Sequence, residues 1–74
     1  MLIEAHGITI DTTKLDFQSG PCSGPRDVCP EKAVDSSGLV VFRSSAAPDL
    51  CAVFTQQEWE AHEQNVLTGA YKKA

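Results

Sequence analysis

The hexapeptide FTQQEW, which begins at Phe54, fixes a strand-to-helix junction near the C-terminus of this chain. Thr55 and Glu58 have the spacing of a capping box, in which the Thr55 hydroxyl accepts a hydrogen bond from the Glu58 amide and the Glu58 carboxylate accepts one from the Thr55 amide. Phe54 and Trp59 have the spacing of a hydrophobic staple, which sets the angle between the incoming strand and the helix. The hexapeptide therefore predicts where a helix begins, and it predicts that Trp59 belongs to the core.

The predicted helix covers residue 56 to about residue 68, and Gly69 ends it because glycine readily adopts the left-handed conformation that closes many helices. Three glutamates lie early in the helix, where the positive end of the helix dipole favours them. Its apolar stripe is thin, and we expect this stripe to lie on a small sheet. The stripe consists of Trp59, His62 and Val66, with Leu67 alongside.

Extended segments account for most of the chain before this helix. Residues 8–12 contain β-branched side chains in alternation, which predicts a strand, and Gly7 separates this strand from a shorter extended piece at 2–5. Residues 18–27 are rich in glycine, proline and serine, and they are therefore predicted to form a loop.

A β-hairpin is predicted after that loop. Residues 28–34 and 39–42 are strand-like and flank a DSSG turn, so antiparallel pairing is the simplest topology. Pro30 lacks an amide hydrogen and must lie on a sheet edge or at a bulge. A second turn at 46–49 leads to the continuous apolar run 50–54, which predicts a strand buried on both faces.

The predicted fold class is α+β, a small antiparallel sheet of about four or five strands with one C-terminal α-helix packed on it. The 74 residues form one small domain, 1–74, without a linker that could divide it. No apolar run reaches the roughly 18 to 20 residues that a membrane-spanning helix needs. The N-terminus lacks the basic and apolar regions of a secretory leader, so we expect a cytoplasmic protein.

The ratio of basic to acidic residues indicates which kind of partner the chain can bind. Six Lys and Arg residues against ten Asp and Glu residues give a net charge of −4. The basic residues are scattered, and only Lys72 and Lys73 are adjacent, so no basic stripe can neutralise a row of phosphates. Composition therefore argues against direct nucleic-acid binding and favours a cationic partner, with the acidic side of the predicted helix as a contact surface.

The cysteines and histidines are candidates for chemistry, but no motif organises them. Cys22, Cys29 and Cys51 are expected to be free thiols in a reducing compartment. Cys22 and Cys29 lack the spacing of a zinc knuckle, and a fourth ligand would have to be His6 or His62. No glycine-rich anion cradle accompanies a nucleophile and a base. We expect no catalytic, cofactor-binding or metal site and no enzymatic activity.

The junction at 53–59 is accompanied by shorter blocks at residues 19–20, 29–33, 38–41 with Ser44, 48–49 and 66–69. In their order and spacing, these blocks between residues 15 and 71 resemble the domain of unknown function 397, a family of small proteins abundant in actinobacteria such as streptomycetes. The junction at 53–59 matches the family pattern almost completely.

The chain also departs from the family pattern. The N-terminal residues 1–14 have no family counterpart and are expected to form an added strand. The other departures are Leu15 or Phe17 in place of a tryptophan, Pro30 and Lys32 within an apolar alternation, Phe42-Arg43 in place of Arg-Asp, and His62 at an apolar helix position.

The resemblance implies a regulatory role, because family members are commonly encoded beside helix-turn-helix regulators of the Xre type and some are described as antitoxin-like. No catalytic residues are established for the family. We therefore predict a non-enzymatic interaction module that binds and modulates such a transcription regulator. The expected contact residues are Phe42, Arg43, Glu60, His62 and Glu63.

Two alternatives remain open on the sequence alone. A thiol- or metal-dependent protein, such as a redox sensor or a zinc-binding protein, would use the three cysteines and a histidine. A self-associating structural domain would gain, as a homodimer, the stability that a thin core does not supply.

Overall fold

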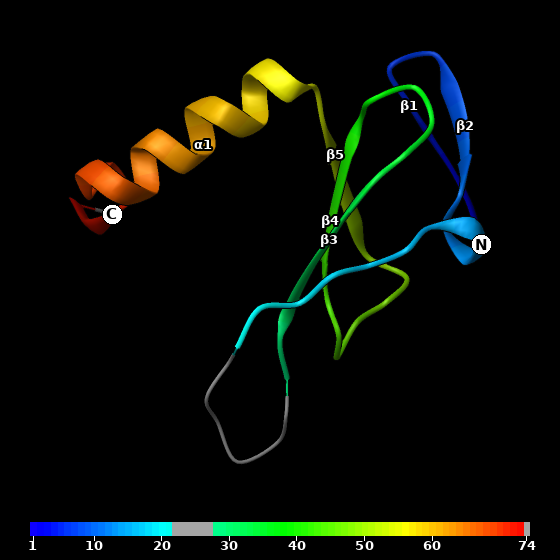
Figure 1. The fold of residues 1–74 in the computed structure, drawn as a ribbon, viewed down its shortest axis with the longest axis horizontal. Helices are drawn as coiled ribbons and strands as arrows, with labels where there is room; N and C mark the ends of the chain where they lie inside the picture. The colour runs from blue at the N-terminus through cyan, green and yellow to red at the C-terminus, as the bar shows by residue number, and fades with distance from the viewer. Residues whose placement is uncertain (22–27, 74) are drawn as a thin grey trace.

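β4 (Val40–Ser44) is the middle strand of the larger of two antiparallel sheets. Val40 and Val41 are both 0 % exposed. Because neighbouring side chains of a strand point to opposite faces, these two valines require that both faces of the sheet be covered at this point. The computed structural model, which describes residues 1–21 and 28–73, shows that two different elements supply the cover (Figure 1).

The described residues have the α+β arrangement that the sequence predicts, with five strands and one C-terminal α-helix. β1 and β2 form a two-stranded sheet, and β3, β4 and β5 form a three-stranded sheet in that order. Short 3-10 helices follow β2 and α1. The bounds are β1 Leu2–Ala5, β2 Ile8–Asp11, 3-10 helix Thr12–Lys14, β3 Pro30–Val34, β4 Val40–Ser44, β5 Cys51–Phe54, α1 Gln56–Thr68 and 3-10 helix Ala70–Lys73.

We name the two faces of the three-stranded sheet by the element that covers them. The hairpin face is covered by β1 and β2, and the helix face is covered in part by α1. Pairing across the strands places Ala33, Val41 and Val53 on the hairpin face. The same pairing places on the helix face Lys32, Val40, Phe42, Ala52 and Phe54.

The β1–β2 hairpin contributes Ile3, Ile8 and Ile10 to the core on the hairpin face. His6 and Gly7 form its turn with φ of 53° and 74°, the positive values that a tight two-residue hairpin turn favours. Ile10 packs with Leu39 and Val41 in the buried core. The N-terminal segment, expected to add one strand, thus adds a complete hairpin. Partly buried side chains that pack against this core are Ile3, Ile8, Leu15, Phe17, Cys51 and Val53.

The outer edge of β3 is paired in part with the segment that precedes it. Gln18 and Lys32 exchange two backbone hydrogen bonds of 2.7 and 2.9 Å. The predicted loop at 18–27 therefore begins with a strand-like contact, while its residues 22–27 lie outside the described residues. β3 is an edge strand of the three-stranded sheet, and Pro30 is its first residue, which agrees with the predicted edge position of this proline. The strand begins at residue 30 rather than at residue 28 as predicted.

α1 begins where the hexapeptide predicts. The Thr55 hydroxyl accepts a hydrogen bond from the Glu58 amide at 3.1 Å, and the Thr55 amide donates to the Glu58 carboxylate at 2.9 Å. The ring centroids of Phe54 and Trp59 are 5.9 Å apart. The helix spans Gln56–Thr68, and the next residue is a glycine with φ of 76°. The predicted start, end and cap are confirmed.

α1 covers only one corner of the helix face and then leads away from the sheet (Figure 1). Trp59 is 8 % exposed, which confirms it as a core residue, and its ring centroid lies 5.1 Å from that of Phe42. Leu50 and Ala52 are exposed. The prediction that residues 50–54 are buried on both faces is therefore wrong, because the helix does not extend over this part of the sheet.

Asp35 organises the predicted turn between β3 and β4. Its carboxylate accepts hydrogen bonds from the Ser37 amide at 3.0 Å, the Ser37 hydroxyl at 2.7 Å and the Leu39 amide at 2.8 Å. Burial by itself raises the pKa of this carboxyl, but the hydrogen bonds outweigh burial and hold the pKa below its usual value. The turn thus depends on an ionised side chain.

Substitution Thr55→Ala is expected to lower the free energy of unfolding by about 1 kcal/mol, because it leaves the Glu58 amide at the start of α1 without its partner. Urea unfolding followed by circular dichroism measures this change. Thr55→Ser is the matched control and keeps most of the stability, since serine caps as well as threonine. Equal stability of Thr55→Ala and the wild type would contradict the assigned role of the cap.

Substitution Asp35→Ala is expected to cost about 1 kcal/mol at neutral pH, since hydrogen bonds to a carboxylate stabilise the turn. The lowered pKa of folded Asp35 means that this stabilisation is complete above the ordinary aspartate pKa of about 3.9 and is lost as the pH falls through the lower folded value.

Urea unfolding of both proteins between neutral and strongly acidic pH tests this expectation. The difference in unfolding free energy between wild type and Asp35→Ala should shrink toward the acid end. Asp49→Ala is the control, because the exposed Asp49 side chain makes no hydrogen bond or ion pair in the described part of the chain. A difference that stays constant down to the lowest pH would count against the ionised turn.

Candidate functional site

A row of aromatic rings attaches α1 to the helix face. Successive centroid distances are 5.9 Å for Phe54–Trp59, 5.1 Å for Trp59–Phe42 and 5.0 Å for Trp59–His62. The His62 ring then lies 5.5 Å from the ring of Tyr71, and its Nδ1 atom is 3.2 Å from the Tyr71 hydroxyl. The ring contacts with the sheet involve only the first two turns of the helix. Among the described residues, the second half of α1 makes no ring contact with the sheet, and the Tyr71 hydroxyl lies 3.4 Å from the Asn65 amide nitrogen.

A groove opens where α1 leaves the sheet. Its volume is about 310 Å³. Val66 and Leu67, on the helix side, are 54 % and 78 % exposed although both are apolar. Side chains this exposed contribute little to the core of their own chain. The residues that line the groove are Phe42, Trp59, His62, Glu63, Val66 and Leu67.

Phe42 also borders a second hollow, of about 430 Å³, on the uncovered part of the sheet. Leu50 is 76 % exposed there. We call the groove and this hollow together the open face, because they meet at Phe42 and no element of the described chain covers them. The residues that line the second hollow are Val28, Cys29, Pro30, Phe42, Arg43, Ser44, Leu50 and Ala52.

Three of the five predicted contact residues come together in this groove. Phe42, His62 and Glu63 all line it. The guanidinium of Arg43 instead lies on the opposite face, where its Nε donates to the Glu31 carboxylate at 2.9 Å and its Cζ atom is 3.6 Å from the centroid of the Phe17 ring. Its charge is therefore engaged within the fold rather than presented with Phe42.

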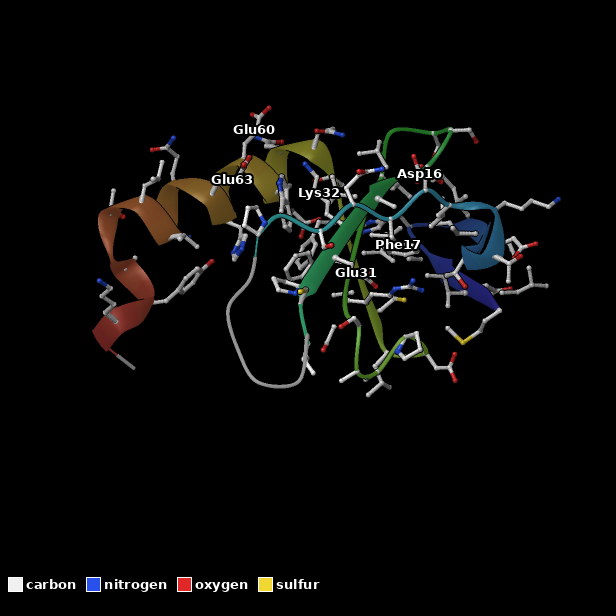
Figure 2. All side chains as sticks on the ribbon, turned by 60° about the horizontal axis from the view of Figure 1, so that its bottom comes forward. Asp16, Phe17, Glu31, Lys32, Glu60 and Glu63 are labelled. Carbon is white, nitrogen blue, oxygen red and sulfur yellow. The ribbon has the colours of Figure 1, made fainter. Side chains whose placement is uncertain are left out.

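The fifth predicted residue, Glu60, is exposed on α1 beside the groove (Figure 2). Within the described part of the chain neither Glu60 nor Glu63 forms an ion pair. Glu58 differs, because its hydrogen bond from the Thr55 amide lowers its pKa and because His6 lies 3.9 Å from its carboxylate. α1 contains no lysine or arginine. The flank of the groove formed by Glu60 and Glu63 therefore carries negative charge that no described ion pair neutralises, and the Lys32 ammonium lies over the neighbouring Trp59 ring.

Trp59 forms the wall of the groove that is continuous with the core. The ammonium of Lys32 lies 5.2 Å from its ring centroid, within the range of a cation–π contact. The indole Nε1 atom is buried and has no hydrogen-bond partner among the described residues. A buried donor without a partner costs free energy, so the packing of this ring must outweigh that cost.

The cysteines and histidines are held in separate places. Cys51 is a free thiol whose sulfur is 3.6 Å from the Pro48 carbonyl oxygen. Cys29 is disulfide-bonded, so the prediction of free thiols is wrong for this residue, and Cys22 lies outside the described residues. His6 contacts the Val53 carbonyl oxygen at 3.3 Å, far along the chain from the His62–Tyr71 pair.

Within residues 1–21 and 28–73, no three His, Cys, Asp or Glu side chains are placed to hold a metal ion together. No helix in this part of the chain is long and apolar enough to cross a membrane.

Sequence reasoning placed Trp59, Val66 and Leu67 on one apolar stripe but did not identify this stripe as a binding surface. The lengths of the predicted elements could have indicated this surface. A 13-residue helix is about 20 Å long, whereas a four- or five-residue strand spans about 13 to 17 Å. A helix attached through its first turns must therefore extend beyond so small a sheet.

Comparison of the chain with protein-family models, with curated proteins and with solved structures finds no match. The resemblance to the domain of unknown function 397 stays a prediction.

The exposed apolar side chains of the open face, Val66 and Leu67, are expected to be dispensable for folding. Leu67→Gln and Val66→Gln should change the free energy of unfolding by less than about 0.5 kcal/mol, because both side chains are exposed. Trp59→Ala should cost about 3 to 5 kcal/mol, most of the stability of a chain this small. Urea unfolding measures all three variants. A loss above about 1 kcal/mol for Leu67→Gln would show that the groove belongs to the core.

Proposed function

We propose that this protein is a non-enzymatic interaction module that binds a helix-turn-helix transcription regulator of the Xre type and modulates it, in the manner of an antitoxin-like partner. The observation that carries the proposal is the open face, an apolar surface centred on Phe42 that no described element of the chain covers. Contiguous exposed apolar surface on a small protein is typical of a site for another macromolecule.

The charge of the chain supports a protein partner rather than DNA. The net charge is −4, and Glu60 and Glu63 flank the groove without basic neighbours on α1. A DNA-binding regulator carries a basic surface for the DNA phosphates, so electrostatic attraction between that surface and this flank would speed association. The resemblance of residues 15–71 to a family commonly encoded beside such regulators supports the same class of partner.

The composition of the groove agrees with a protein interface. Aromatic residues are enriched at such interfaces, where they supply large apolar area together with a polar edge. Phe42, Trp59 and His62 contribute three rings to one groove. A stable interface of standard size buries about 800 Å² on each partner, which the groove and the neighbouring hollow would have to supply together.

Binding of a purified Xre-type regulator encoded beside this protein should be measurable by calorimetry and should weaken as salt is added. An increase from about 0.05 M to about 0.5 M salt shortens the screening length several-fold, so we expect the affinity to fall about threefold or more. A DNA duplex without the regulator serves as the control and should not bind. Failure of the regulator to bind even at the lower salt concentration would overturn the proposal.

Self-association is the second candidate function, because an uncovered apolar surface also suits a second copy of the same chain. Native mass spectrometry separates the two candidates. The proposed module should be monomeric in the absence of its partner, and a stable dimer formed through the open face would favour the structural alternative.

A further inference from the structure

The helix face of the three-stranded sheet stays uncovered beside α1, around Phe42 and Ala52. Three strands spaced about 4.8 Å apart make a sheet roughly as wide as one helix with its side chains, which is about 10 Å across. α1 covers this width only at one end, where Trp59 contacts Phe54, Phe42 and Lys32, and then departs (Figure 1). The other end of the helix face, at Ala52, stays uncovered. Sheet faces in small domains are ordinarily covered by a layer of helices. The helix layer of this domain is incomplete.

The uncovered space has the shape of a helix-binding groove. Its floor is the sheet, represented by Phe42 and Ala52, and its wall is α1, represented by His62, Val66 and Leu67. A helix laid beside α1 would contact the wall at the usual interaxial distance of about 8 to 10 Å and would rest on the sheet at the same time. Its apolar side would cover the exposed Leu67 and the half-buried Phe42 in a single contact.

The charges select the kind of helix. Glu60 and Glu63 lie on the flank of α1 beside the groove, and no ion pair satisfies them in the described part of the chain. A partner helix with lysine or arginine on the facing flank would pair with these carboxylates across the rim. A second copy of this chain instead brings a helix without any basic residue and a net charge of −4.

We propose that the occupant of the groove is an amphipathic α-helix of a partner protein, with apolar residues at helical spacing on one side and lysine or arginine along the flank that faces α1. This inference rests on the proposed function only for the class of protein that supplies the helix. The helix-in-groove mode anchors its ligand through residues at positions i, i+3, i+4 and i+7.

Two designed peptides provide the probe. Each is about 18 residues long, roughly five helical turns, with leucines at positions i, i+3, i+4 and i+7 and without tryptophan. One carries lysine on both flanks of the leucine stripe, and its twin carries glutamate. Trp59 is the only tryptophan of the protein and lines the groove, so its fluorescence reports occupancy directly.

The lysine peptide should bind and change the Trp59 fluorescence, and the glutamate twin should bind at least about tenfold more weakly. Leu67→Gln should weaken binding of the lysine peptide about tenfold, and the double variant Glu60→Gln, Glu63→Gln should remove most of its advantage over the twin. Leu2→Gln is the matched control, because Leu2 is 69 % exposed on β1, outside the groove, and its substitution should leave binding unchanged.

Three results would overturn the inference. The first is that neither peptide binds, and the second is that both bind equally. The third is that the protein dimerises with rising concentration and that Leu67→Gln abolishes the dimer, which makes a second copy the occupant.

Titration of the Xre-type regulator into the same variants separates this inference from the proposed function. A regulator that binds wild type and Leu67→Gln equally well keeps the function and overturns the groove as its site. A regulator that does not bind, while the lysine peptide still does, keeps the groove and overturns the function.

Discussion

The packing of the Trp59 ring between Phe42 and Phe54 holds α1 on the sheet. The capping box places this ring, because it starts the helix at a fixed residue after β5. The same contact explains the burial of Val40 on the face below it. Since the ring lies near the start of a 13-residue helix, the remaining turns have no sheet beneath them. The position of one side chain thus determines both the core and the exposed apolar surface.

The two faces of the sheet are covered unequally, and we expect function on the less covered helix face. The β1–β2 hairpin covers the hairpin face, and Ile10, Leu39 and Val41 form a closed core there. The helix face is closed only at the Trp59 corner and continues into the groove. A small domain with one complete core can expose such a surface without unfolding, since its stability does not depend on it. The acidic flank formed by Glu60 and Glu63 then favours partners with basic residues at the contact.

Local signals in the sequence predict the elements of the fold well. The capping box, the DSSG turn and the glycine after α1 each act within a few residues, and the structure confirms them. The period of two also places the side chains of Phe42 and Arg43 on opposite faces of the sheet, in agreement with the Arg43–Glu31 ion pair. The direction of α1 and the Gln18–Lys32 pairing depend on contacts between distant segments, so no local pattern contains them. The overhang of α1 is the part of the groove that the sequence could have shown, because the predicted helix is longer than the predicted strands.

Amide hydrogen exchange, measured with and without the bound regulator, tests the central claim most directly. In the free protein, amides at residues 64–68 should exchange much faster than those of β4, because this half of α1 lies beyond its contact with the sheet. Binding should slow exchange in this half of α1 while the β1–β2 hairpin stays unchanged. Equal protection of α1 and β4 in the free protein, or new protection confined to the hairpin, would contradict the account.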